Sequence, residues 1–96
     1  PRLRNLDVPW KFNSSEKEIV KSFGQPNAER MFLLDDAVVP FRASLRSKLP
    51  FALRSSKVKE LEYVRQDIRT YFWFVQNRQK IWTVFDQWSI PSSATP

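Results

Sequence analysis

The stretch from Ser56 to Trp88 constrains the fold most, because it contains neither glycine nor proline and carries most of the aromatic side chains of the chain. Its centre, Tyr71 to Val75, is an unbroken apolar run. A helix that is apolar on all sides is normally buried. We therefore expect one long helix over Lys57–Trp88, with Ser55 or Ser56 as its N-cap, or the same helix broken near Gln76-Asn77.

On a helical wheel the apolar residues of this stretch form two stripes, separated by more than a quarter turn. The first stripe comprises Val58, Leu61, Val64, Ile68, Phe72, Val75 and Trp82. The second comprises Tyr63, Phe74, Ile81, Phe85 and Trp88. Two apolar faces indicate a central helix packed on both sides, or a helix that turns one face to the domain and the other to a partner. In either case we expect Phe72 to be buried.

Ser15 and Glu18 match the capping box, in which a serine is followed three residues later by glutamate. This pattern predicts a helix over Glu16–Phe23. Gly24 is the only glycine of the chain. It stands directly after the predicted helix, where a positive φ is expected.

Two further helices are expected before the long one. Asn27 is a candidate N-cap for a helix over residues 28–34, although the run 30–34 is also short enough to be a strand. Pro40 suits the first turn of a helix that ends at Leu49. The first two helices, joined through Gly24, resemble a helix-turn-helix in outline, but a plain helical hairpin fits the apolar and acidic second element better.

The sequence thus predicts an all-α fold, a small bundle of about four helices around one long C-terminal helix. Residues 1–12 are expected to form an N-terminal arm packed on the domain. Residues 13–90 are expected to form a single helical domain, and residues 91–96 a flexible tail.

The chain has no cysteine and no histidine. Disulfides, the usual zinc sites, a cysteine nucleophile and a histidine base are therefore excluded. We expect a non-enzymatic binding protein with no catalytic residue, no cofactor and no metal. The lack of cysteine is typical of a reducing compartment, so an intracellular location, nuclear or cytoplasmic, is expected. No apolar stretch is long enough to span a bilayer.

Sixteen basic residues against ten acidic ones give a net charge of +6. The segment from Ala37 to Lys59 contains no acidic residue, and Arg, Lys and Ser side chains are those that contact phosphate oxygens. The first functional hypothesis is therefore nucleic-acid binding, mainly through the phosphate backbone. The candidate residues are Arg42, Arg46, Lys48, Arg54, Lys57 and Lys59.

The alternative is a protein-interaction or dimerisation module. Large aromatic residues are favoured at the centre of interfaces. The candidate partner-binding residues are Phe74, Ile81, Phe85 and Trp88, on the second stripe of the long helix. An acidic protein or a second copy of the chain is the expected partner. Docking of the basic segment on an anionic membrane is a third and weaker alternative.

Overall fold

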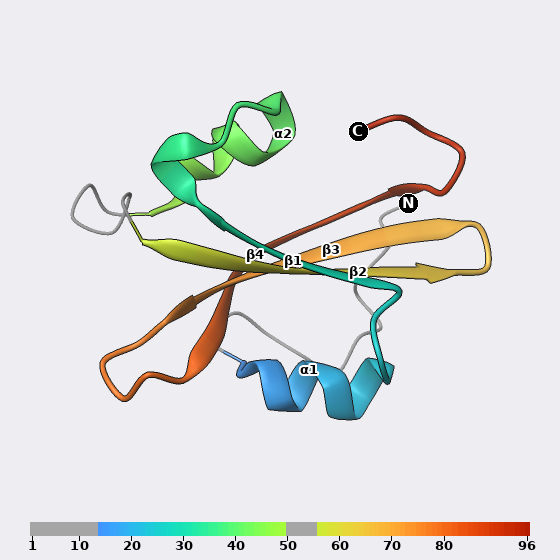
Figure 1. Cartoon of the computed structure of the whole chain (residues 1–96). Helices are drawn as coiled ribbons and strands as arrows, with labels where there is room; N and C mark the ends of the chain where they lie inside the picture. The colour runs from blue at the N-terminus through green and yellow to red at the C-terminus, as the bar shows by residue number, and fades with distance from the viewer. Residues whose placement is uncertain (1–13, 50–55) are drawn as a thin grey trace.

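Four antiparallel strands, rather than a long helix, form the centre of this computed structural model, which describes residues 14–49 and 56–96 (Figure 1). The sheet has the order β1-β2-β3-β4, and each strand pairs with the next one along the chain. The strands are β1 (Ala28–Leu33), β2 (Lys57–Arg65), β3 (Ile68–Gln76) and β4 (Trp82–Pro91). The predicted all-α bundle is therefore wrong, and the stretch expected to be one long helix consists of three strands.

Elements on both faces of the sheet explain the misleading apolar run. Helix α1 (Glu16–Phe23) lies below the sheet in Figure 1. Above it lie helix α2 (Pro40–Ala43) and the 3-10 turns η2 (Leu34–Asp36) and η3 (Ser44–Lys48). All five residues from Tyr71 to Val75 are buried in β3. A strand covered on both faces reads as a continuous apolar run, which periodicity cannot separate from a buried helix.

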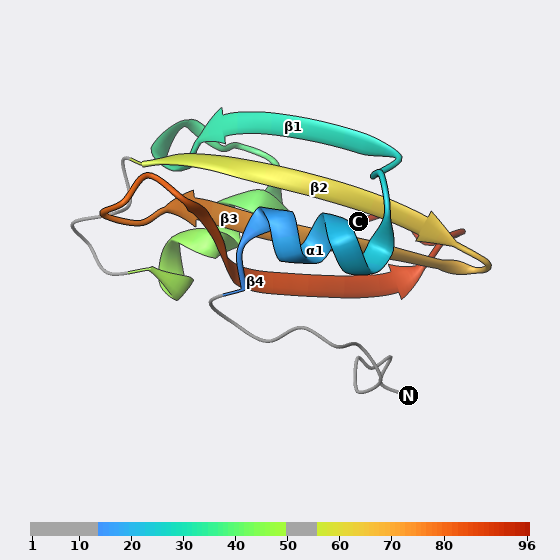
Figure 2. The ribbon, with the colours of Figure 1, turned by 90° about the horizontal axis from the view of Figure 1, so that it is seen from below.

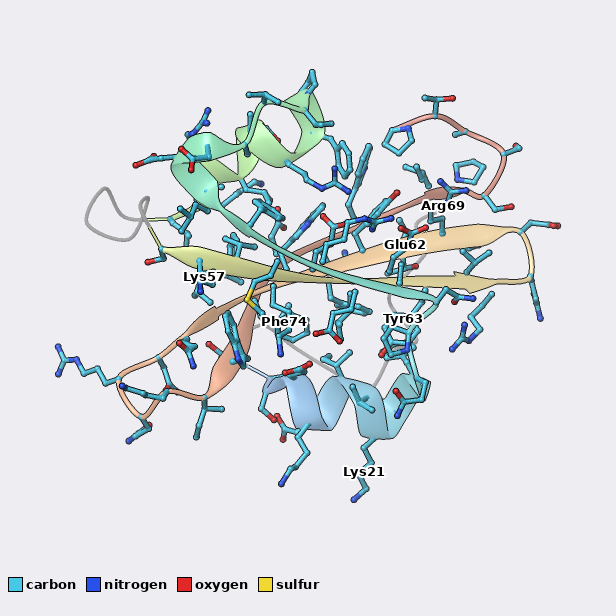
Figure 3. The ribbon with its side chains drawn as sticks, viewed as in Figure 1. Lys21, Lys57, Glu62, Tyr63, Arg69 and Phe74 are labelled. Atoms are coloured by element: carbon cyan, nitrogen blue, oxygen red, sulfur yellow. The ribbon has the colours of Figure 1, made fainter. Side chains whose placement is uncertain are left out.

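Alternation along the strands divides the core into two layers. The upper layer, below α2 and η3, contains Leu34, Leu45, Leu49, Val58, Tyr71, Trp73 and Val75. The lower layer, above α1, contains Ile19, Leu61, Tyr63, Phe72, Phe74 and Val84. Figure 3 shows Tyr63 and Phe74 on the side of α1. Phe72 is buried, as expected, but it does not share a face with Val75, because successive side chains of a strand point to opposite faces.

The hairpin turns lack the glycine that usually marks them. Gln66 in the β2–β3 turn and Lys80 in the β3–β4 turn both take positive φ, at 54° and 65°. The second turn is organised by the Asn77 side chain, whose Oδ1 accepts hydrogen bonds from the amides of Gln79 and Ile81. Asn-Gly and Asp-Gly are the strongest short-range hairpin signals. Because neither dipeptide occurs in this stretch, the sequence did not indicate where one strand ends and the next begins.

Helix α1 has the predicted bounds and both hydrogen bonds of the predicted capping box. The Glu18 amide donates to Ser15 Oγ at 3.2 Å, and the Ser15 amide donates to Glu18 Oε1 at 2.8 Å. Gly24 has φ 82° and ψ −161°. The expected positive φ is therefore confirmed. The position also lies in a region of the backbone map that is essentially restricted to glycine.

Replacing Gly24 with alanine is expected to lower the free energy of unfolding by about 1–3 kcal/mol, because alanine is strained at this φ and ψ. A Cβ at this position would meet no atom within 4 Å, so the cost is one of backbone conformation and not of packing. Urea unfolding of the variant measures the loss. Ser22→Ala, at an exposed helical position, is the control and should change little. Equal stability of Gly24→Ala and the parent would contradict the backbone conformation.

The secondary structure between α1 and β2 agrees only in part with the prediction from the sequence. The helix predicted over residues 28–34 is wrong, and the strand considered for residues 30–34 corresponds to β1. Asn27 does not cap a helix. Its Oδ1 accepts from the Val64 amide and from Arg65 Nη1, so it ties the start of β1 to the end of β2. Pro40 does begin a helix, but the helical segment is divided between α2 and η3.

The predicted N-terminal arm, residues 1–12, lies outside the described residues. The predicted tail, residues 91–96, begins at Pro91, the last residue of β4, and continues beside the β2–β3 turn. There the Ser92 amide donates to the carbonyl of Asp67, and Arg69 Nη2 donates to the carbonyl of Ser92.

Candidate functional site

Glu60 in the middle of β2 is fully buried, with 0% of its surface exposed. The strand register places Arg30, Glu60, Trp73 and Asp86 side by side across the four strands, on the upper face of the sheet. Arg42 of α2 approaches the same carboxylate from above. The row and this arginine bring together residues that are far apart in the sequence.

Four hydrogen bonds satisfy the Glu60 carboxylate. Oε1 accepts from Arg42 Nε at 2.7 Å and from Trp73 Nε1 at 2.8 Å. Oε2 accepts from Arg30 Nη1 at 2.7 Å and from Arg42 Nη2 at 2.9 Å. The Arg42 guanidinium also lies 4.6 Å from the centre of the Phe41 ring. The pair of bonds from Arg42 is bidentate, which is the strongest form of an arginine–carboxylate contact.

Burial alone would raise the pKa of Glu60, but the hydrogen bonds from Arg42, Trp73 and Arg30 outweigh it and lower that pKa below its ordinary value of 4.5. The carboxylate is therefore ionised at neutral pH. Its lone pairs are occupied and it is shielded from solvent, so Glu60 holds α2 and β1 on the sheet and offers no site to a ligand.

Arg30 also connects Glu60 to charged residues that lie nearer the β2–β3 turn. Arg30 Nη1 also donates to Glu62 Oε1 at 2.8 Å, and Arg69 Nε lies 3.6 Å from Glu62 Oε2. Figure 3 shows Glu62 and Arg69 together above the sheet. Arg69 Nε is buried without a hydrogen-bond partner among the described residues, although Nη2 of the same side chain is bonded to Ser92.

The residues predicted to bind nucleic acid lie on two faces of the sheet. Arg42 is bound to Glu60, and Arg46 Nη2 donates to the carbonyls of Asp35 and Ala37. Lys48 lies on the upper side, 4.0 Å from Asp86. Lys59 lies on the lower side, with Nζ 2.9 Å from Glu16 Oε1. Lys57 is exposed on β2, and Arg54 lies outside the described residues.

The residues predicted to bind a partner are also dispersed, because the helical face that would unite them does not exist. Phe74 is fully buried against α1, whereas Phe85 packs on the upper core. Ile81 is exposed just before β4, and Trp88 is 36% exposed on the upper face. Of these four side chains, only Ile81 and Trp88 are accessible to a ligand to any large extent.

Apolar side chains that are exposed gather instead at the outer edge of β1, a feature that the sequence reasoning missed. Four of the six large apolar side chains that are exposed in residues 14–49 and 56–96 belong to this region: Met31, Leu33, Val38 and Val39. Val38, at 86%, is the most exposed of them. We call these four residues, with the neighbouring Lys57, the β1 edge surface.

The backbone of β1 has one side directed away from the sheet. The Leu34 amide donates to the carbonyl of Ser56, which continues the register of the β1–β2 pair. Hydrogen-bonded residues alternate in an antiparallel pair. The amides and carbonyls of Glu29, Met31 and Leu33 therefore point outward, and no strand of the described residues pairs with them.

Helix α1 does not extend beneath this edge. Figure 2, seen from below, shows α1 across the middle of the sheet and β1 outside its cover. Two depressions follow the edge. One of about 390 Å³ is lined by Met31, Phe32 and the Ala37–Val39 segment, with Arg30 and Arg42 beside them. The other, of about 310 Å³, lies between Met31, Phe32, Leu33 and Lys57.

The sequence contained a signal for this surface. The run from Met31 to Leu34 is apolar and is followed, after two aspartates, by Ala37, Val38 and Val39. The helix predicted over residues 28–34 gave no indication of which of these side chains are exposed. Only the position of β1 at the border of the sheet exposes them.

Three cysteine, histidine, aspartate or glutamate side chains placed to hold a metal ion do not occur in the part of the chain that the structure describes. No helix in that part is both long enough and apolar enough to cross a membrane. The sequence matches no protein-family model, and comparison with curated proteins and with solved structures gives no match either.

Proposed function

We propose that this domain is a protein-binding module that accepts an extended segment of a partner as an additional strand beside β1. The observation that carries the proposal is the coincidence of outward backbone groups with exposed apolar side chains at one edge. Strand addition uses both, because main-chain hydrogen bonds supply affinity and side-chain contacts supply specificity.

The fitting occupant is an extended segment with apolar side chains at every second position. Such a segment would place them against Met31 and Leu33 on one side or against Val38 and Val39 on the other. Lys57 is exposed and makes no ion pair with another described residue, so it favours a carboxylate in the occupant near Leu33.

The opposite edge of the sheet is less suited to this role. At β4 the Val84 amide already donates to the carbonyl of Ser14, and Ser15 forms a bridge with Thr83. Long apolar edges are normally avoided in natural sheets because they invite pairing. The exposed apolar side chains at β1 are therefore stronger evidence for a binding edge than an unpaired edge strand alone would be.

Phosphate binding by the basic segment stays a prediction. Two of its six cations, Arg42 and Lys59, already have carboxylate partners at 2.7 and 2.9 Å, so they are less available to phosphate. The exposed Lys57 belongs to both hypotheses, and a direct experiment can separate them.

Met31→Lys combined with Leu33→Lys is expected to abolish binding of an extended peptide, because two charges would replace the apolar contacts of the edge. The probe is a blocked Val-Glu-Val-Glu-Val-Glu-Val peptide, titrated into isotopically labelled domain. In the parent, the amides of Glu29, Met31 and Leu33 should gain protection from hydrogen exchange. The inward amides of Arg30 and Phe32 should not.

Ile81→Lys is the matched control, since Ile81 is as exposed as Met31 but lies away from β1. It should bind the peptide as the parent does. Equal binding by the double variant would contradict the proposal. A dimer of the free domain that the double variant loses would assign the edge to self-pairing. If the parent binds duplex DNA at low salt and the Lys57→Gln variant does not, phosphate binding would be supported.

A further inference from the structure

A pocket of about 250 Å³ lies on the upper face between the α2–η3 segment and β4, separate from the β1 edge surface. Its aromatic lining is formed by Phe41, Trp73 and Trp88. Its polar lining includes Lys48 and Asp86, with Ser44 and Gln87 beside them. The pocket is smaller than the roughly 300–1,000 Å³ typical of sites for whole drug-sized ligands, so it suits a compact head group.

A β-bulge directs Asp86 into this pocket. Phe74 pairs with Val84 and Trp73 pairs with Asp86, so Phe85 is the extra residue of β4. Without the bulge, Asp86 would lie two residues beyond Val84 on the lower face, because strand side chains alternate. Bulges recur where a side chain is re-aimed next to a functional site. Here the bulge places a carboxylate beside three aromatic rings.

The Asp86 carboxylate lacks a close countercharge. Its side chain is 19% exposed, and its ion-pair partner among the described residues is Lys48, with Nζ 4.0 Å from Oδ2. The Lys48 side chain is 55% exposed, so its ammonium group remains largely in water. Burial raises the pKa of Asp86, whereas the Gln87 amide and Lys48 only partly oppose this effect. Asp86 is thus a partly buried carboxylate whose ion-pair partner among the described residues is 4.0 Å away, and such a group in a pocket is a candidate for binding a cation.

The aromatic rings add to the attraction for a cation. The rings of Tyr71 and Trp73 are stacked at 5.7 Å, and the Trp88 ring lies 6.2 Å from Tyr71. Phe41 lies over this row, 5.5 Å from the Trp88 ring. Ring faces carry negative quadrupole potential, and substituted ammonium groups bind where several rings meet. Trp88 lines the pocket and is 36% exposed, so part of its side chain is accessible to a ligand.

We propose that this pocket binds a methylated ammonium group, with its positive charge against Asp86 and its methyl groups against Trp88 and Phe41. A bare ammonium group is strongly hydrated, and Lys48 accordingly stays at the entrance. Methyl groups lower that hydration and make apolar contact with the rings. The ligand displaces the Lys48 ammonium group from Asp86.

The test is a titration of the full chain with tetramethylammonium chloride and with choline chloride, against sodium chloride at equal concentration. The indole N–H resonance of Trp88 should shift in a saturable manner. Asp86→Asn should weaken binding about tenfold or more, which corresponds to the loss of about 1.4 kcal/mol. Lys48→Gln should strengthen it, because the competing ammonium group is removed. Asp67→Asn, at an exposed turn, is the control and should bind as the parent does.

Binding by Asp86→Asn within about twofold of the parent, or a shift no larger than that caused by sodium chloride, would overturn the proposal. Asp86→Asn should fold, since it removes a poorly compensated charge. Trp88→Leu provides a second variant, and unchanged affinity there would also overturn the proposal. A trimethyllysine peptide that binds more tightly than choline, while its unmodified counterpart does not bind, would assign the head group to a modified protein. Tighter binding of choline would assign it to a small molecule.

Discussion

Replacing Glu60 with glutamine is expected to lower the free energy of unfolding by about 3–5 kcal/mol, the cost of removing one partner from a buried ion pair. Glutamine is nearly isosteric, but its amide nitrogen would face guanidinium donors, and Arg42 would lose its countercharge. The side chain of Arg42 is 20% exposed, so water replaces the lost carboxylate only in part. Arg30 is more exposed and keeps its ion pair with Glu62. The expected loss of unfolding free energy is therefore toward the lower end of the range. Guanidinium chloride unfolding at neutral pH measures it.

Glu29→Gln is the matched control, because it makes the same chemical change on the neighbouring strand. Its carboxylate is 52% exposed and 3.9 Å from Lys59. Exposed pairs contribute about 0–1 kcal/mol, so this variant should remain close to the parent. If Glu60→Gln and Glu29→Gln are equally stable, the buried network does not hold α2 and β1 on the sheet.

The pH dependence of the Glu60→Gln effect is an independent measurement of the same carboxylate. Because the pKa of Glu60 is lowered in the folded state, its stabilising contribution is fully present above the unfolded value of 4.5. It is lost as the pH falls through the lower, folded value. The stability difference between the parent and Glu60→Gln should therefore be constant near neutral pH and shrink in acid. A difference that grows in acid would contradict the sign of the shift.

Phe72→Ala is expected to lower the free energy of unfolding by about 3–5 kcal/mol, because it opens a cavity in the lower core. Phe72 is 1% exposed, and its ring lies 5.2 Å from that of Phe23 and 5.9 Å from that of Tyr63. It joins α1 to the centre of the sheet. Since small domains have a total stability of roughly 5–15 kcal/mol, the variant should melt at a much lower temperature. Calorimetry or circular dichroism measures the change.

Ile81→Ala provides the comparison for Phe72→Ala. Ile81 is 47% exposed, so its truncation opens no internal cavity and should cost far less. A cooperatively melting Phe72→Ala domain with the stability of Ile81→Ala would mean that the lower layer is not a packed core.

Neither candidate binding site could be predicted from the sequence as a site, and only single residues of each, Lys57 at the β1 edge surface and Lys48 and Trp88 at the pocket, were expected to bind a ligand. Lys48 and Trp88 both appeared among the predicted site residues, but in different hypotheses. The pocket joins them because η3 lies over β4. Asp86 was missed, since its orientation depends on a bulge that has no glycine to mark it. The β1 edge surface was missed because an apolar run looks the same at the border of a sheet as in its centre.

Features that depend on near neighbours could be derived from the sequence by itself. The capping box at Ser15 and Glu18, the positive φ of Gly24 and the helical start at Pro40 each rest on interactions within a few residues. Such contacts form in the same way wherever the segment is placed. The burial of Phe72 was also predictable, because a large aromatic residue in a strongly apolar run enters a core in either type of secondary structure.

The tertiary structure alone decided that residues 57–91 form strands. It also decided which charged side chains are buried and which groups they pair with. Tyr71 to Val75 satisfies either a buried helix or a strand covered on both faces, and only the layers formed by α1 and α2 select the strand. Glu60 gave no sign in the sequence of being buried. Its partners Arg30, Arg42 and Trp73 come from three other elements, and a charge enters a protein interior only where such partners converge. That convergence is a property of the sheet register, which local sequence does not encode.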